Sequence, residues 1–198
     1  MIIRSIRAAI LLLIAALFSV SLIAPASAAR VYNADTNKWE DSNAKTGSTL
    51  AKSYARKVVD FKTDLAVGSV LVDTSDRWLY LIQENGKALR YGVGVGREGF
   101  QWSGRNRISR KAEWPGWTPP AAMRKRQPGL PAYMPGGPDN PLGARAMYIG
   151  STLYRLHGTS DPNSIGRAVS SGCIRLMNDD VIDLYERVRV GALVVVQD

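Results

Sequence analysis

Short apolar runs, separated by turn-forming residues, are the feature of this sequence that most restricts its fold. Three of them follow one another, each rich in valine, leucine, isoleucine or tyrosine: "SVLVDTS" at 69–75, "RWLYLIQ" at 77–83 and "ALRYGVGVG" at 88–96. Runs of this length and composition are typical of β-strands. Ser75-Asp76 separates the first two runs, and Asn85-Gly86, which favours a type I′ hairpin turn, separates the second from the third. The sequence therefore predicts an antiparallel meander at the start of a β-rich domain.

The rest of this domain continues the β pattern and adds one clear helix. Further strands are predicted at 105–114, 145–150, 153–158 and 192–197. The helix is predicted over 178–191, with Asn178 as its N-cap, Asp179 and Asp180 at the positive end of the helix dipole, and Gly191 as its stop. Its apolar face consists of Val181, Leu184, Tyr185 and Val188. The predicted class is mainly β with one or two helices, an α+β fold.

The first residues have the pattern of a signal peptide. Arg4 and Arg7 form a basic start, residues 8–24 form an apolar stretch, and residues 26–28 form a small-residue cleavage site. We interpret residues 1–28 as a signal that exports the protein beyond the inner membrane of a bacterium. A membrane anchor is the alternative, because the apolar stretch is almost long enough to span a bilayer.

Residues 29–66 are predicted to be a spacer between the signal and the folded domain. The first part of this segment is polar and rich in turn formers. Its second part, "TLAKSYARKVVDF" at 49–61, places four apolar residues roughly on one side of a helix of about three turns. The folded domain itself is predicted to cover residues 67–198.

From Pro115 to Gly143 the strand pattern stops. The stretch is dense in proline and glycine, which exclude a long helix or a central strand. A loop of this length inside a compact domain is usually functional, for example as a lid or a binding wall. Trp117, Tyr133 and Met134 give the loop apolar weight. These side chains either stack on a ligand or fasten the loop to the core, and the sequence does not decide between the two.

Charge restricts the possible partners only in part. The chain has 26 Lys and Arg against 17 Asp and Glu; with Arg4 and Arg7 set aside, 24 basic residues remain and the formal charge is +7. These residues are scattered and form no Lys/Arg cluster of the kind that binds nucleic acid, so nucleic acid is not expected as a partner. An exported basic protein meets anionic polymers of the cell envelope. The alternative is a charged surface that only confers solubility.

His157 and Cys173 are the only histidine and the only cysteine of the chain. A single thiol cannot form an internal disulfide, so in an exported protein it is either an inert buried side chain or a reactive group. The turn-forming residues before Cys173 favour an exposed thiol. A thiolate attacks carbonyl carbon, and a nearby imidazole takes the thiol proton and returns it to a leaving amine. We interpret the two residues as nucleophile and general base; a structural histidine is the alternative.

Two neighbours of the thiol fit the same chemistry. The backbone N–H groups of Gly172 and Cys173 belong to a flexible turn and can converge on a developing oxyanion. Arg175 follows two residues later and can bind a substrate carboxylate through two hydrogen bonds. An ion pair with Asp179, Asp180 or Asp183 is the alternative role of this arginine.

These residues resemble the signature of a known family. His-Gly-Thr at 157–159 and Ser-x-Gly-Cys-Ile-Arg at 170–175 look like the motif of the L,D-transpeptidase catalytic domain. The resemblance continues through "RWLYLI", "YGVGVGREGFQWSG", "WPGWTPP" and "GGPDNPLGARAMYIG", so it covers roughly residues 67–198. The resemblance implies a β-sandwich catalytic domain and an enzyme that needs no metal or organic cofactor. It also suggests substrate contacts at the residues Ser170, Ser171, Gly158 and Thr159.

One position departs from the family pattern. Members often have Ser-His-Gly-Cys, whereas this chain has serine at position 171. A role for that second histidine cannot be carried over to Ser171, so the general base has to be His157. A backbone carbonyl is expected to orient its other ring nitrogen, and Gly158 is the candidate.

The resemblance implies acyl transfer on peptidoglycan stem peptides. Cys173 would attack the carbonyl of an L-centre before a terminal D-alanine, release D-alanine, and pass the acyl group to an amine to form a 3→3 cross-link. An envelope protein is a further possible acceptor, and the periplasm or cell wall is the expected location. Hydrolysis by a carboxypeptidase or amidase of the same fold is the main alternative, and a non-catalytic wall-binding module is a weaker one. A sortase-like enzyme spaces its residues more widely, and a papain-like enzyme places cysteine before histidine.

Overall fold

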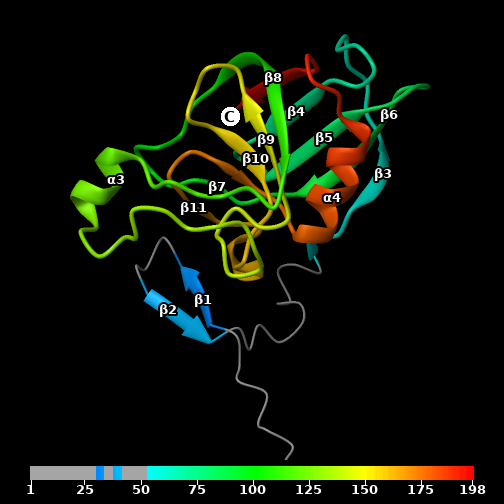
Figure 1. Ribbon diagram of the computed structural model, residues 1–198. Helices are drawn as coiled ribbons and strands as arrows, with labels where there is room; N and C mark the ends of the chain where they lie inside the picture. Colours follow the sequence, from blue (N-terminus) through cyan, green and yellow to red (C-terminus); the bar gives the residue numbers. More distant parts are fainter. Residues whose placement is uncertain (1–29, 34–37, 42–52) are drawn as a thin grey trace, which may run out of the picture.

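The computed structural model describes residues 30–33, 38–41 and 53–198, and Figure 1 shows their arrangement. β1 (Arg30–Asn33) and β2 (Lys38–Asp41) form a two-stranded antiparallel hairpin. The predicted signal peptide at residues 1–28 lies outside the described residues. Within the described ranges, no helix combines the length and the hydrophobicity that crossing a bilayer requires.

Residues 53–198 fold around one nine-stranded sheet with the order β12-β10-β9-β8-β13-β4-β5-β6-β3. In chain order its strands are β3 (Lys57–Asp60), β4 (Val70–Asp73), β5 (Trp78–Ile82), β6 (Lys87–Gly92), β8 (Gly104–Glu113), β9 (Arg145–Ile149), β10 (Arg155–His157), β12 (Ile174–Arg175) and β13 (Leu193–Gln197). A small second sheet pairs β7 (Val95–Gly96) with β11 (Ala168–Ser170). The helices are α3 (Ala121–Arg126), the short 3₁₀ helix η1 (Pro162–Ser164) and α4 (Asn178–Arg187). The predicted α+β class, mainly β, is confirmed.

The predicted meander is formed by β4, β5 and β6. Each of these strands pairs antiparallel with the next. Asn85 and Gly86 have φ angles of 58° and 65°, and a type I′ turn requires positive φ at both central positions. Val70 and Leu79 are among the alternate strand residues that are completely buried, because successive side chains point to opposite faces of a strand.

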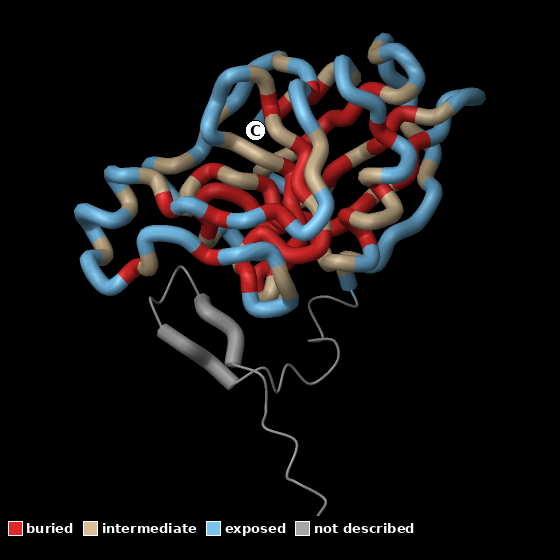
Figure 2. Tube along the Cα trace, viewed as in Figure 1, coloured by how far each residue is buried: buried red, intermediate tan, exposed pale blue. Residues whose placement is uncertain are grey.

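β8 joins the two halves of the large sheet because it is long and bends. Its residues 104–107 pair with β13, and its residues 108–113 pair with β9, with a register shift between Ile108 and Arg110. An irregularity of this kind bends a strand, so the sheet curls and both halves contribute side chains to one core. Figure 2 shows the buried segments gathered inside this curl. The sandwich-like packing is thus made from one continuous hydrogen-bonded sheet.

α4 packs against β9, and the apolar face predicted for it is buried apart from the partly buried Tyr185. Its ends differ from the prediction. Asn178 is the first helical residue and Met177 is the N-cap, and the helix ends at Arg187, before the predicted glycine stop. The Asn178 side chain accepts a hydrogen bond from the Ala144 N–H at 3.0 Å. Because this side-chain oxygen is bonded to the Ala144 N–H, Asn178 does not cap the helix.

Part of the predicted spacer belongs to the large sheet. β3 pairs antiparallel with β6 and forms the edge of the sheet. The helix predicted over 49–61 is therefore wrong at residues 57–60. The open edge of β6 offers these residues backbone hydrogen bonds, and tertiary pairing outweighs a weak helix propensity. Val58, which was expected on the apolar face of that helix, is 56% exposed. The apolar periodicity of this segment therefore does not mark a buried face.

The loop at 115–143 contains α3 and a small apolar cluster of its own. Trp117, Leu130, Met134 and Leu142 are buried together, and Trp117 forms an isolated β-bridge with Met134. Trp117 and Met134 are only 5% and 7% exposed, whereas Tyr133 is 59% exposed. Trp117 and Met134 therefore help to fasten the loop, whereas Tyr133 does not, and ligand contact by Trp117 stays a prediction.

Candidate active site

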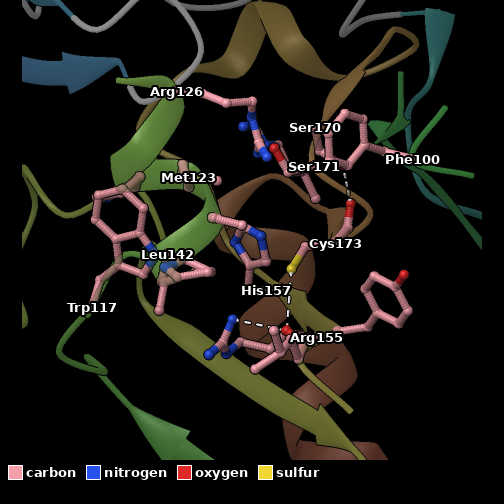
Figure 3. A pocket seen from close by; sticks show the side chains of 16 residues that line it. Phe100, Trp117, Met123, Arg126, Leu142, Arg155, His157, Ser170, Ser171 and Cys173 are labelled. Atoms are coloured by element: carbon pink, nitrogen blue, oxygen red, sulfur yellow. Dashed lines mark hydrogen bonds between the residues drawn. The ribbon is translucent and has the colours of Figure 1, made fainter. Parts of the chain in front are cut away.

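β10 and β12 place the predicted catalytic residues at one cavity. The two strands pair in parallel, with Leu156 opposite Ile174 and His157 opposite Arg175. Leu156 and Ile174 are part of the core, so the residues on either side of them face the opposite way, because side chains alternate along a strand. That opposite face opens into a cavity of about 350 Å³, whose lining includes His157, Cys173 and Arg175 (Figure 3).

His157 is held in one tautomer by its own neighbour. Its Nδ1 lies 2.5 Å from the carbonyl oxygen of Gly158, and because a carbonyl only accepts hydrogen bonds, Nδ1 carries the proton. This is the carbonyl expected to orient the ring. Burial, and after it the nearby Arg175 guanidinium, lower the pKa of His157 to about 3. The imidazole is therefore neutral at physiological pH, with Nε2 as its basic nitrogen.

Cys173 follows a tight turn that Ser170 holds together. The Ser170 Oγ donates a hydrogen bond to the Cys173 carbonyl at 2.6 Å and accepts one from the Gly172 N–H at 3.1 Å. The thiol is half-buried, and its Sγ lies 3.8 Å from the carbonyl oxygen of Leu153. The Gly172 N–H, predicted as one oxyanion donor, is taken up by Ser170 in this structure. The Cys173 N–H remains a predicted oxyanion donor.

Two aromatic residues that sequence reasoning missed contact the turn: Trp102 from outside the cavity lining, and Tyr154, which lines the cavity. The Trp102 Nε1 donates a hydrogen bond to the carbonyl oxygen of Gly172 at 2.7 Å. Its ring stacks on Tyr154, with centroids 4.6 Å apart and planes 4° apart. Gly172 has a φ of +104°, and a Cβ atom there would overlap the Tyr154 ring, so glycine alone fits without strain. No motif reveals this contact, because it joins three separate segments of the chain.

Ser171 has a structural partner that sequence alone did not indicate. Its Oγ accepts a hydrogen bond from Arg97 Nη1 at 3.1 Å, and the same nitrogen donates to the Val169 carbonyl at 3.4 Å. The Arg97 guanidinium also lies 4.3 Å from the centroid of the Phe100 ring. Ser171 and Phe100 both line the cavity (Figure 3). The serine is therefore fixed in place at a position where the resembling family often has histidine.

Arg175 lines the cavity although it is only 9% exposed. Its backbone N–H and carbonyl both pair with those of Gly94, at 2.8 and 2.9 Å. Two of the acidic residues named as its alternative partners, Asp180 and Asp183, form ion pairs with Arg56 at 3.7 and 3.0 Å. Binding of a substrate carboxylate by Arg175 remains a prediction.

Gly158 and Thr159 lie outside the lining of the cavity. Gly158 acts on the site through the hydrogen bond to His157. The Thr159 hydroxyl is buried and accepts a hydrogen bond from the Asp161 N–H at 3.0 Å. Both residues therefore have a supporting position in this structure, and their contact with a substrate stays a prediction.

The loop at 115–143 forms one wall of the cavity. Trp117, Met123 and Leu142 line it from this side, as Figure 3 shows. Tyr133 and Met134 lie outside the lining. The wall is thus mostly aliphatic, with Trp117 as the one predicted loop residue that reaches the site.

The fold and this site are those of a recognised class of domain. Residues 68–196 match the family model described as the L,D-transpeptidase catalytic domain, and the chain belongs to this family. Among the relatives, the probable L,D-transpeptidase ErfK/SrfK of Escherichia coli is 40% identical over 137 residues, which cover 65% of this chain and 44% of that protein. The chain thus spans less than half the length of this relative.

Solved structures agree with this assignment of fold. The L,D-transpeptidase from Mycobacterium smegmatis matches with a TM-score of 0.52 at 17% identity, over 65% of this chain and 58% of that one. At this identity the likeness is one of fold alone. A Brucella melitensis protein named as a probable carnitine operon oxidoreductase is 41% identical, covers 70% of this chain and 91% of that one, and has a TM-score of 0.50. The oxidoreductase name differs from the family description and applies to the Brucella protein only.

Proposed function

We propose that this protein is an exported cysteine transpeptidase that acts on the stem peptides of peptidoglycan. The observation that carries the proposal is a single cavity that holds the Cys173 thiol and a neutral, carbonyl-oriented His157. A thiol and a basic imidazole are the two groups that acyl transfer through a thioester requires. Membership of the L,D-transpeptidase family supports the choice of substrate.

The first half-reaction forms an acyl-enzyme on Cys173. The Sγ attacks the carbonyl carbon of an L-centre, diaminopimelate in many bacteria, that precedes a terminal D-alanine. His157 Nε2 takes the thiol proton as the S–C bond forms and gives it to the D-alanine nitrogen as the C–N bond breaks. Because the pKa of His157 is about 3, the imidazole is a weak base in the resting site. In this proposal the proton moves to Nε2 during the attack.

The second half-reaction transfers the acyl group. An amine of a neighbouring stem attacks the thioester, His157 accepts the amine proton, and the proton returns to the Cys173 sulfur as the C–S bond breaks. The product is a 3→3 cross-link and a regenerated thiol. An amine of an envelope protein would give an attached protein, and water would give hydrolysis. In each case the Cys173 N–H stabilises the oxyanion of the tetrahedral intermediate.

The division of the chain supports action outside the inner membrane. The basic and apolar pattern of residues 1–28 is that of an export signal. The predicted spacer, shortened at its C-terminal end because residues 57–60 belong to the large sheet, would then separate this signal from the catalytic domain, in the periplasm or at the cell wall. The excess of basic residues fits attraction to an anionic envelope polymer.

Incubation with a disaccharide-tetrapeptide, followed by mass spectrometry of the products, tests the proposal. Dimers that have lost D-alanine are the expected result, together with a transient mass increase on the protein. Tripeptides alone would identify a carboxypeptidase. Unchanged substrate would contradict the proposal and favour a wall-binding module or a different linkage.

A further inference from the structure

We propose that Arg126, stacked on Phe100, binds the terminal carboxylate of the donor stem peptide. This inference rests on the proposed function and names the residue that recognises the end of the substrate. Arg126 lies on α3, in the loop that forms one wall of the cavity, and it reaches the cavity beside Ser171 (Figure 3). Carboxylate binding was expected at Arg175 instead.

The charge of the cavity calls for an anionic occupant. Its lining contains three arginines, Arg126, Arg155 and Arg175, and among the described residues that line it there is no aspartate or glutamate. His157, the other titratable base of the lining, is neutral at physiological pH. The lining therefore carries positive side chains and no negative ones, which favours an occupant with a carboxylate.

Arg126 differs from the other two arginines in what it contacts. Arg155 Nη1 already donates a hydrogen bond to the Leu153 carbonyl at 3.0 Å, and Arg175 is nearly buried. The Arg126 side chain is exposed, and its one recorded contact within the described part of the chain is with the Phe100 ring, 5.0 Å from the centroid. Stacking on a ring orients a guanidinium and leaves its N–H edge available for the two parallel hydrogen bonds that carboxylates accept.

Arg97 is a second cation next to Phe100. Its guanidinium lies 4.3 Å from the Phe100 centroid, and its hydrogen bonds to Val169 and Ser171 hold it in place. Two cations thus share one aromatic ring. A bound anion lowers the repulsion between them, because the cavity is partly shielded from water and charges interact more strongly there.

The position of Arg126 agrees with the length of the substrate. In the donor, the terminal carboxylate belongs to the residue directly after the scissile bond. Consecutive Cα atoms are about 3.8 Å apart, so this carboxylate stays in the same cavity when the scissile carbonyl contacts Cys173. A stem with one more residue would place its carboxylate about one residue length further on. Binding by Arg126 would therefore select stems that end directly after the scissile bond.

The test compares Arg126→Gln with Arg124→Gln, which removes the same charge from the same exposed helix outside the cavity lining. Both substitutions are made in the full chain with Cys173→Ala, so that binding is measured without turnover. Isothermal calorimetry gives the Kd of a disaccharide-tetrapeptide and of the same compound with its terminal carboxylate converted to an amide. Circular dichroism checks that the variants are folded, and Arg126→Lys serves as a second variant that keeps the charge without the planar fork.

We expect Arg126→Gln to raise the Kd of the tetrapeptide about ten-fold or more, the range for a charge-assisted hydrogen-bonded pair. The Kd of the amide should be unchanged by this substitution, Arg124→Gln should change neither value, and Arg126→Lys should fall between. An equal effect of the two glutamine substitutions, or an equal loss for peptide and amide, would overturn the inference. The transpeptidase proposal is judged separately by product analysis of the unaltered protein, so either can fail while the other stands.

Discussion

Replacement of Trp102 by phenylalanine would show whether this ring controls the geometry of the Cys173 amide. The Gly172 carbonyl and the Cys173 N–H belong to one planar peptide group and point in opposite directions. The 2.7 Å hydrogen bond from Trp102 Nε1 to that carbonyl therefore fixes the direction of the N–H that is the remaining candidate oxyanion donor. Phenylalanine keeps an aromatic ring against Tyr154 and removes the hydrogen-bond donor.

The structure gives the size of the expected effect. A neutral hydrogen bond contributes about 0.5–1.5 kcal/mol to stability, and the smaller ring also loses packing. We expect the free energy of unfolding to fall by about 1–2 kcal/mol, which lowers Tm by about 2–8 °C in a domain of this size. Complete loss of an oxyanion donor costs about 10²–10³ in rate. A donor that is kept but no longer fixed should cost less, about ten-fold.

Two thiol reagents separate geometry from reactivity. Acylation by a carbapenem, an inhibitor class that the family resemblance suggests, passes through an oxyanion, whereas alkylation by iodoacetamide does not. Intact-protein mass spectrometry follows both reactions. Trp102→Phe should slow acylation about ten-fold and leave alkylation unchanged, and Trp114→Phe, at an exposed residue outside the cavity lining, should change neither. Equal slowing of both reactions, or unchanged acylation, would refute the role given to Trp102.

Further substitutions test the other groups. Cys173→Ala should abolish turnover and keep the fold; retained turnover would remove the nucleophile assignment. His157→Gln should slow carbapenem acylation roughly 10²-fold, whereas Ser171→Ala should be tolerated far better because only an Arg97 contact is lost; an undiminished rate in His157→Gln would contradict its role as base. The imidazole of His157 has a pKa near 6.5 in the unfolded chain and about 3 in the folded protein. This group therefore makes the free energy of unfolding, measured with urea, fall as pH drops below about 6.5. His157→Gln should weaken that pH dependence. Burial raises the pKa of Asp180 to about 6, so the effect of pH on stability is opposite to that of His157. The stabilising contribution of the protonated Asp180 carboxyl is present below about pH 4 and is lost as pH rises through 6. Asp180→Asn should therefore raise stability at pH 8 by about 1–2 kcal/mol and have no such effect at pH 4; no gain at pH 8 would count against the buried-carboxyl explanation.

The regular elements were predictable because they depend on local signals. Alternating apolar residues, Asn85-Gly86 and the apolar face of α4 all act over a few neighbouring positions. The helix expected over 49–61 failed for the converse reason, since its fate depends on the distant edge of β6. Asn178 was similarly diverted from its capping role by the Ala144 amide, which belongs to a remote segment.

The residues of the candidate site also fall into those with a local sequence signal and those without one. His157, Cys173 and the Gly158 carbonyl were identified from their types and spacing within one short stretch. Trp102 and Arg126 carry no such signal, because their roles come from contacts with segments far away in the chain. The occupied Gly172 N–H could not be foreseen either, since it depends on the rotamer that Ser170 adopts.

The position of β13 has a consequence for how the protein folds. This strand pairs with β8 on one side and with β4 on the other, and Val194 lies opposite Val70, so it holds together the meander and the half of the sheet that carries the site. Pairing of residues so distant in sequence is entropically expensive and slow to form. The meander can assemble early, but the two halves cannot join until residues 193–197 are in place. Reactivity of the thiol should therefore appear late in refolding, and a chain cut before β13 should retain at most a partly ordered meander.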